Sequence, residues 1–353
     1  MIPAQEGLAL GVVLGSTVPP EELVDCVRII ERSGFSEIWA TEDYFFTGGI
    51  STAALALASA ENLRVGLGVL PIYGRHPAVL AMEVSTLAGA FPGRLMLGLG
   101  IGVRSTIDQL GLGSRSPMRT VAETLTSIRE LLAGRTLDQS GTYQYRDVAL
   151  TYPPAHVPPL MIGAVGPKML AQSGRIADGT VLSILVGPEY VRRARGHIET
   201  GMHEVGRPSS AHRLTTYALL SVDDDPGKAR DVLRPTVAHY LGNGGTNPLT
   251  DAAGISEQLA EIVEEDGVSG LEESMPDEWI DALCICGSVR DCALKIQALF
   301  DAGSDAVALM LTPDADLAPV LGRLGEHVRD LRASATSKTS QTRHGSMTAE
   351  GQG

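Results

Sequence analysis

The feature that most constrains the fold is an alternation of short apolar runs with longer amphipathic runs along the chain of 353 residues. The apolar runs have the length of buried strands and the amphipathic runs the length of helices. Eight strands, each attached to a helix, are predicted at Leu8–Leu14, Glu37–Thr41, Arg64–Leu70, Arg94–Gly100, Leu160–Ala164, Gly179–Leu185, Arg213–Val222 and Ala306–Leu311. Repeated strand–helix units imply parallel strands with right-handed crossovers. The expected fold is an α/β (β/α)₈ barrel with insertions, and a doubly wound open sheet is the alternative.

Two stretches break this alternation. Residues 134–159 hold an alternating segment followed by a proline-rich one, and they are predicted to form an inserted hairpin. Residues 242–281 are irregular in pattern and are predicted to form a second, partly helical insertion. The barrel domain is expected to span residues 1–332. The last stretch, 333–353, is rich in Ser, Thr, Gly and Gln with nothing to bury, so disorder is predicted there.

Charge and hydropathy disfavour several classes of partner. The formal net charge is −14 and no basic stripe is visible, which argues against nucleic acid and against anionic membrane surfaces. No apolar run approaches the roughly 18 residues that span a bilayer. The N-terminal residues lack the positive start and apolar core of a signal peptide. A cytosolic protein is expected.

The cysteines point to packing rather than to a metal. The four are Cys26, Cys284, Cys286 and Cys292, which provide no disulfide framework. Cys284 and Cys286 have the look of a zinc half-site, but no second pair or histidine cluster complements them. Buried thiols are expected, and no metal.

A glycine-rich strand end is the first candidate for ligand binding. Gly98, Gly100 and Gly102 alternate, and Ser105 and Thr106 follow with hydroxyl donors. A ligand can lie on such a backbone, or the glycines can serve tight packing inside a barrel. The spacing is not the G-x-G-x-x-G of a dinucleotide fold, and no acidic residue follows at the required distance.

A second candidate lies where glycine precedes a helix that begins with proline. Gly166, Pro167, Lys168 and Met169 would direct free N–H groups and a positive helix end toward the barrel mouth. Lys168 adds a cation. A phosphate cradle is predicted, with an ordinary strand–helix turn as the alternative.

Titratable residues follow two other strands. Glu42 and Asp43 come after the second strand, at the end of a barrel where active sites lie, although such acids can also be ordinary loop residues. His76 precedes Pro77 after the third strand, and it is either an acid–base group or a helix cap.

Taken together, these segments resemble the bacterial luciferase-like superfamily of flavin and deazaflavin oxidoreductases, from about residue 7 to 330. The segments that carry the resemblance are Arg64–Glu83, Phe91–Gly102, Ile162–Leu170, Ile176–Thr180 and Cys286–Cys292. Within the superfamily, the chain is most similar to the branch that uses coenzyme F420, such as the methylenetetrahydromethanopterin reductases.

This resemblance implies a set of roles. A non-proline cis peptide at Gly68–Val69 would form a bulge in the third strand and cushion the deazaflavin ring. The acid at the end of the second strand corresponds to Glu42 or Asp43. Phosphate contacts would fall on Gly100–Thr106, Gly166, Pro167 and Lys168. A homodimer is also expected, because dimers are common in the resembled family.

One departure bears on the substrate. The methanopterin reductases carry a glutamate in the first strand, where this chain has Gly11, Val12 and Val13. The leading hypothesis is therefore an F420-dependent oxidoreductase that moves hydride to or from a small, more hydrophobic metabolite. Glu42, Asp43 or His76 would manage the proton. The alternatives are an FMN-dependent monooxygenase of the same fold with a partner flavin reductase, a non-catalytic flavin-binding protein, and a phosphosugar barrel enzyme.

Overall fold

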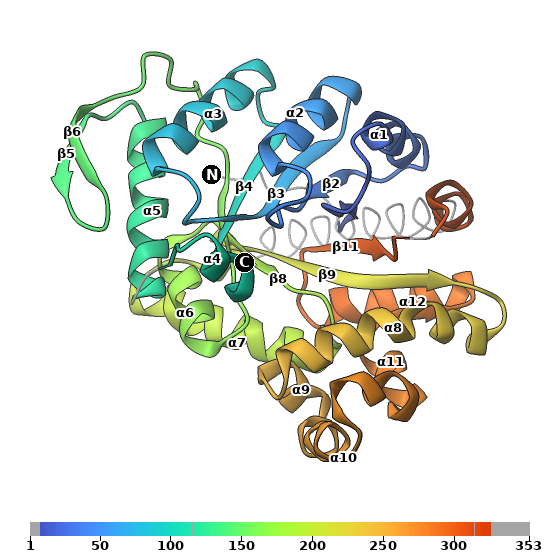
Figure 1. The fold of residues 1–353 in the computed structure, drawn as a ribbon. Coiled ribbons are helices and arrows are strands. Elements are labelled where there is room, and N and C mark those ends of the chain that lie inside the picture. The colour runs from blue at the N-terminus through green and yellow to red at the C-terminus, as the bar shows by residue number, and fades with distance from the viewer. Residues whose placement is uncertain (1–7, 114–115, 314, 326–353) are drawn as a thin grey trace, which may run out of the picture.

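A computed structural model describes residues 8–113, 116–313 and 315–325, and it shows a closed parallel barrel (Figure 1). Parallel pairs run through the whole sheet, and the β8–β9 and β1–β11 pairs close the cylinder. The barrel strands are β1 (Ala9–Leu14), β2 (Glu37–Ala40), β3 (Arg64–Pro71), β4 (Leu95–Gly100), β7 (Leu160–Gly163), β8 (Gly179–Leu182), β9 (Arg213–Val222) and β11 (Ala306–Leu311). The predicted barrel is confirmed, and the open sheet is excluded.

A short additional strand pairs with the end of β9, outside the closed barrel. β9 pairs with β8 through its first residues and with β10 (Ile285–Gly287) through its last ones, Leu220–Val222. β10 is not one of the eight strands predicted from the sequence.

Helices surround the barrel, and several begin where proline stands at the first helical position. Proline suits that position because its missing N–H would have no partner in the helix. The helices are α1 (Leu23–Arg32), α2 (Gly49–Ser59), α3 (Pro77–Ala90), α4 (Arg104–Gln109), α5 (Pro117–Leu132), α6 (Pro167–Ile176), α7 (Pro188–Glu204), α8 (Pro226–Gly244) and α12 (Val289–Asp301). Residues 317–325 are also helical. Among the described residues, no helix has the length and apolar character needed to cross a membrane.

Both irregular stretches have defined structure. β5 (Leu137–Ser140) and β6 (Gln144–Val148) form the hairpin expected within 134–159. The stretch 242–281 is more helical than expected, with α9 (Pro248–Ala253), α10 (Ser256–Ser274) and α11 (Asp277–Leu283) grouped beside α8 (Figure 1). Gly254, with φ of 72°, ends α9, and Gly267, with φ of 71°, interrupts α10. The predicted disordered tail lies outside the described residues.

The interior of the barrel is filled with side chains. Val13, Trp39, Met96, Met161 and Tyr217 belong to one buried cluster, which continues toward α8, α10 and α11. A second and larger cluster lies between the barrel and its surrounding helices. Because the interior is packed, ligand binding is restricted to the barrel mouth.

Candidate active site

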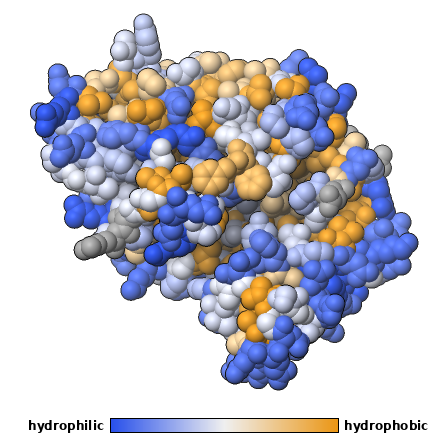
Figure 2. Space-filling model, viewed as in Figure 1, coloured by the Kyte–Doolittle hydropathy of each residue, from blue (hydrophilic) through white to orange (hydrophobic). Residues whose placement is uncertain are grey.

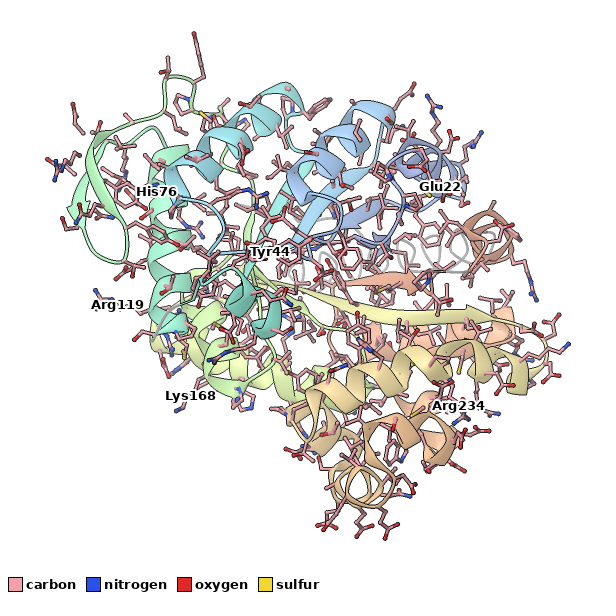
Figure 3. The ribbon with its side chains drawn as sticks, viewed as in Figure 1. Glu22, Tyr44, His76, Arg119, Lys168 and Arg234 are labelled. Carbon is pink, nitrogen blue, oxygen red and sulfur yellow. The ribbon has the colours of Figure 1, made fainter. Side chains whose placement is uncertain are left out.

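The loops that follow β2 and β4 bring exposed apolar side chains to the barrel mouth. These side chains are Phe45, Phe46, Ile101, Val103, Leu110 and Leu112. Figure 2 shows hydrophobic side chains gathered near the centre of the viewed face, beside a hollow. In Figure 3, Tyr44 lies at the centre of the same view, whereas His76 and Lys168 lie toward its edge. The mouth therefore combines an apolar rim with a small number of polar groups.

The end of β3 carries a bulge. The pairing of β3 with β4 changes register between Leu67 and Leu70, and the Gly68–Val69 peptide is cis. This cis peptide confirms what the family resemblance implied. A second non-proline cis peptide, at Tyr44–Phe45, was not anticipated from the sequence.

The glycines of neighbouring strands make room for the side chain of Val69. A Cβ on Gly163 would lie 2.9 Å from Val69 Cγ1, and a Cβ on Gly98 would lie 3.3 Å from the same atom and only 2.5 Å from the Leu67 carbonyl oxygen. A Cβ on Gly100 would overlap Val69 Cγ2. Packing around the bulge thus accounts for these three glycines, and for Gly98 and Gly100 this was one of the two interpretations open from the sequence.

Gly102 has a different reason to be glycine. Its φ of 72° lies in the left-handed region, and a Cβ there would come within 3.1 Å of Pro71. Of the two hydroxyl residues that follow, Ser105 is exposed, and Thr106 donates a hydrogen bond to the Val103 carbonyl at 2.9 Å. The Thr106 hydroxyl thereby serves the start of α4.

The buried carboxylate of Glu42 is fully engaged. Arg75 donates to both of its oxygens, at 2.5 and 2.8 Å, and the Gly49 N–H donates to Oε2 at 2.9 Å. The hydrogen bond to Glu42 raises the pKa of Arg75. Glu42 therefore ties the end of β2 to the loop after β3 and to the first turn of α2.

The neighbouring carboxylate of Asp43 is only partly engaged. Asp43 is half-buried, and its Oδ2 accepts a hydrogen bond from Ser16 Oγ at 2.7 Å. Ser16 is itself fixed, because its N–H donates to Thr41 Oγ1 at 2.8 Å and its carbonyl accepts from Thr47 Oγ1 at 2.9 Å. Among the described residues, no second hydrogen-bond donor to the Asp43 carboxylate is found. Asp43 thus keeps capacity to accept a proton or a ligand donor.

His76 occupies the cap position of α3. Its Nδ1 accepts a hydrogen bond from the Ala78 N–H at 3.2 Å. Its ring also meets Tyr143 and Tyr145 of the hairpin edge-on, with centroid distances of 5.3 and 5.1 Å. Of the two roles considered for His76, the structure contains the helix cap, and the same ring docks the hairpin.

The start of α6 has the features expected of a cradle. Gly166 stands at the cap position, Pro167 begins the helix, and no side chain caps its first turn. Pro167 and Lys168 are exposed, and Met169 is half-buried against the core. The backbone donors of this turn therefore have no side-chain acceptor.

Three residues of the site, Arg75, Ser16 and Tyr217, were not predicted from the sequence. A signal for Arg75 existed, because a buried carboxylate needs a cationic partner and Arg75 stands beside His76 in the same segment. Tyr217 donates a hydrogen bond from within the barrel to the Gly68 carbonyl, 3.0 Å away. Nothing near Tyr217 in the sequence marks it as different from other strand residues.

The four cysteines are free thiols. Three of them, Cys284, Cys286 and Cys292, are buried, as expected. In the part of the chain that the structure describes, no group of three or more His, Cys, Asp or Glu residues is placed to hold a metal ion.

Curated relatives resemble most of this chain. A 5,10-methylenetetrahydromethanopterin reductase from Methanolobus tindarius is 27% identical over 302 residues, covering 84% of this chain and 92% of that protein. The enzyme of the same name from Archaeoglobus fulgidus is 29% identical over 291 residues, covering 80% and 87%. An F420-dependent glucose-6-phosphate dehydrogenase from Nakamurella multipartita is 31% identical over 225 residues, covering 60% and 66%.

Solved structures share the fold. The coenzyme F420-dependent tetrahydromethanopterin reductase from Methanopyrus kandleri superposes with a TM-score of 0.80 at 24% identity, covering 91% of this chain and 98% of that one. A monooxygenase from Streptomyces bottropensis superposes with a TM-score of 0.70 at 18% identity, covering 92% and 99%. The family model described as luciferase-like monooxygenase matches residues 7–306. The chain belongs to the luciferase-like monooxygenase family.

Proposed function

We propose that this protein is an F420-dependent oxidoreductase that moves hydride between the deazaflavin and a small hydrophobic molecule. The observation that carries the proposal is the β3 bulge at Gly68 and Val69, with the partly buried Val69 side chain at the barrel mouth. The deazaflavin, when bound, supplies the hydride chemistry, and the barrel orients it. Relatives that match most of the chain are named methylenetetrahydromethanopterin reductases, and a solved structure that covers 91% of it is named for its dependence on coenzyme F420.

The residues at the mouth suit an anionic cofactor with a planar ring. Gly68 and Val69 would support the ring, beside the apolar rim. The uncapped first turn of α6 offers backbone donors to a phosphate. The residues proposed to hold the phosphate part are Gly100, Gly102, Ser105, Thr106, Gly166, Pro167, Lys168 and Met169.

Asp43 is the proposed proton-handling group. Glu42 is committed to Arg75 and Gly49, and His76 accepts a backbone hydrogen bond at the start of α3. Asp43 combines partial burial with a single fixed donor, Ser16. This leaves its second oxygen available to take a proton from, or return one to, a bound substrate.

The proposed substrate is hydrophobic. Val13 is buried in the barrel interior, at the strand where the resembled reductases carry an acid. The exposed rim residues Phe45 and Phe46 extend the apolar surface outward. A methanopterin is therefore not the proposed substrate, although relatives carry that name.

An FMN-dependent monooxygenase working with a partner flavin reductase is the second candidate. The likeness in fold to the Streptomyces bottropensis monooxygenase favours it. Separate fluorescence titrations with F420 and with FMN distinguish the two. We expect saturable binding of F420 at lower concentration than FMN, and tighter FMN binding with oxygen uptake after reduction would contradict the proposal.

Replacement of Asp43 tests the assignment of the proton-handling group. Asp43→Asn should leave F420 binding intact and lower turnover by roughly 10²–10⁴-fold, the usual contribution of general acid–base catalysis. Turnover is measured as the change in F420 absorbance with a panel of hydrophobic alcohols, ketones and enones. Ser16→Ala, which removes only the donor to Asp43, should have a smaller effect. Full turnover by Asp43→Asn would remove Asp43 from the mechanism.

A further inference from the structure

A buried charged group forms the base of a connected column inside the barrel. Glu37 is fully buried, and its Oε1 accepts a hydrogen bond from Arg213 at 2.6 Å and is also paired with Arg64. Its Oε2 accepts a hydrogen bond from Trp39 Nε1 at 3.1 Å. Both oxygens of the carboxylate are therefore satisfied, and the indole of Trp39 is held in one orientation.

The column continues from Trp39 to Tyr217. The two rings meet edge-on, with centroids 5.9 Å apart and planes inclined by 66°. Glycines on β3 make this contact possible. A Cβ on Gly66 would overlap the Trp39 indole, and a Cβ on Gly68 would overlap the Tyr217 hydroxyl. Two β3 glycines are thus explained by the column rather than by a ligand.

The top of the column is the β3 bulge. The Tyr217 hydroxyl donates to the Gly68 carbonyl at 3.0 Å, in a fully buried setting. Burial, followed by the charge of Glu37, raises the pKa of Tyr217, so the phenol keeps its donor proton. On the other side of the bulge, the Val69 side chain fits between Gly100 and Gly163. The bulge is therefore held from inside the barrel and from the neighbouring strands.

We infer that Tyr217 is a positioning residue for the cofactor ring, acting through its hydrogen bond to the Gly68 carbonyl. The inference rests on the proposed function, in which the ring lies against the bulge. A ring at this position would contact the Gly68–Val69 peptide, and the Tyr217 hydroxyl fixes the orientation of that peptide from inside the barrel. Without the hydroxyl, the Gly68 carbonyl is left buried and without its donor, so the bulge relaxes toward other conformations.

The experiment compares Tyr217→Phe with Tyr143→Phe. Tyr143 provides a matched control because its hydroxyl also donates to a backbone carbonyl, that of Ile72, at 2.8 Å, but from the hairpin outside the barrel. Two properties are measured for each variant: F420 affinity by fluorescence titration, and hydrogen exchange of the β3 peptide containing Val69 and Leu70. Exchange is measured without cofactor.

We expect Tyr217→Phe to exchange faster across the bulge and to bind F420 roughly tenfold more weakly, the effect of losing one buried hydrogen bond. Tyr143→Phe should leave both properties unchanged. If Tyr217→Phe does not fold, Trp39→Phe tests the same column, because it removes the indole donor to Glu37 together with part of the ring that packs against Tyr217, and it should change exchange and affinity in the same direction.

Two results would overturn the inference. One is wild-type exchange at the bulge in Tyr217→Phe. The other is wild-type F420 affinity in that variant despite faster exchange. Failure of the wild-type protein to bind either F420 or FMN would instead overturn the proposed function, and the exchange measurement would still decide whether Tyr217 holds the bulge.

Discussion

At the end of β2, two neighbouring carboxylates contact different partners. Glu42 meets a guanidinium and a helix N-terminus, while Asp43 meets one serine hydroxyl. A carboxylate whose oxygens are both occupied is suited to holding loops together, whereas one with an open oxygen can exchange protons. The difference between the two acids comes from their surroundings and not from their own chemistry.

Removal of the Glu42 carboxylate should lower stability more than it alters chemistry. Glu42→Gln cannot form the bidentate ion pair, so Arg75 is left half-buried without its main acceptor. We expect a loss of about 1–3 kcal/mol in the free energy of unfolding, less than for a fully buried pair because Arg75 reaches solvent. Urea unfolding measures the loss.

Glu83→Gln is the control for this prediction. Glu83 also lies near Arg75, but at the longer distance of 3.8 Å. Glu83→Gln should lower the free energy of unfolding by less than Glu42→Gln does. Equal losses in the two variants would contradict the central place of Glu42 in the network.

At the scale of residues, the sequence predicted where the two acids lie but not which side chains they contact. Glu42 and Asp43 could be placed at the barrel mouth because each follows a predicted strand. Their partners could not be foreseen, since Arg75 and Ser16 lie 33 and 27 residues away and meet them only after the barrel forms. The cis peptide at Gly68–Val69 was expected solely from family resemblance.

At the scale of elements, β3 and β4 fit together through complementary sizes. Val69 projects from the bulge of β3 into the space left by Gly100 of β4, and Gly98 makes room for the Leu67 carbonyl of β3. This arrangement gives the alternating glycines a structural reason that is independent of any ligand.

A paired substitution tests the fit between β3 and β4. Gly100→Ala alone should destabilise the protein and disturb the bulge, because its Cβ would overlap Val69 Cγ2. Adding Val69→Ala removes the Cγ atoms in the way and should recover part of the lost stability. Thermal unfolding of both single variants and the double variant measures the coupling.

Gly166→Ala serves as the comparison, since nothing lies within 4 Å of a Cβ at that position. Gly166→Ala should leave the thermal stability nearly unchanged without a compensating substitution elsewhere. Additive effects of Gly100→Ala and Val69→Ala would contradict the proposed packing.

The hairpin depends on α3 through one residue. His76→Ala removes the acceptor for Ala78 N–H and the edge-on contacts with Tyr143 and Tyr145. We expect a loss of about 1–2 kcal/mol from the cap and the ring contacts together. Proteolysis within residues 137–148 should become faster, with turnover largely kept. A collapse of turnover without faster proteolysis would restore His76 as an acid–base group.

The regular helices and strands could be predicted because the spacing of their apolar residues repeats within a short stretch of sequence. The insertion at 242–281 was underestimated for a physical reason: Gly254 and Gly267 adopt left-handed φ values that divide it into short helices. Each piece is too short to display a clear amphipathic period. The hairpin was easier to detect, because alternation shows within a few residues.

For the whole molecule, the filled interior decides where chemistry can take place. The column from Glu37 to Tyr217 occupies the barrel, so a ligand reaches only the strand ends and their loops. The eight strand–helix units could be counted from the sequence, and that count was sufficient to predict closure. Which side chains fill the barrel could not be predicted from the sequence and is known only from the structure.

Stability of the whole fold should depend on pH through His212. This residue is buried next to Thr180, with Nε2 2.8 Å from its hydroxyl. Burial, assisted by the charges of Arg195 and Arg207, lowers its pKa to about 3. The folded protein therefore keeps His212 neutral while the unfolded chain takes up a proton below about pH 6.5.

The free energy of unfolding should accordingly fall as the pH decreases from about 6.5 toward 3, by up to roughly 1.4 kcal/mol per pH unit from this group. Urea unfolding of the wild type and of His212→Gln between pH 7 and 5 measures it. The variant should show a shallower slope. Identical slopes would mean that His212 does not contribute.

The pairing of β1 with β11 has a consequence for biosynthesis. β11 lies between β1 and β9, so one late segment covers two strand edges at once. On the ribosome, β1 emerges first and waits until residues 306–311 have left the exit tunnel. Throughout that interval both edges are open to pairing with other nascent chains. The barrel therefore closes only after translation has passed β11.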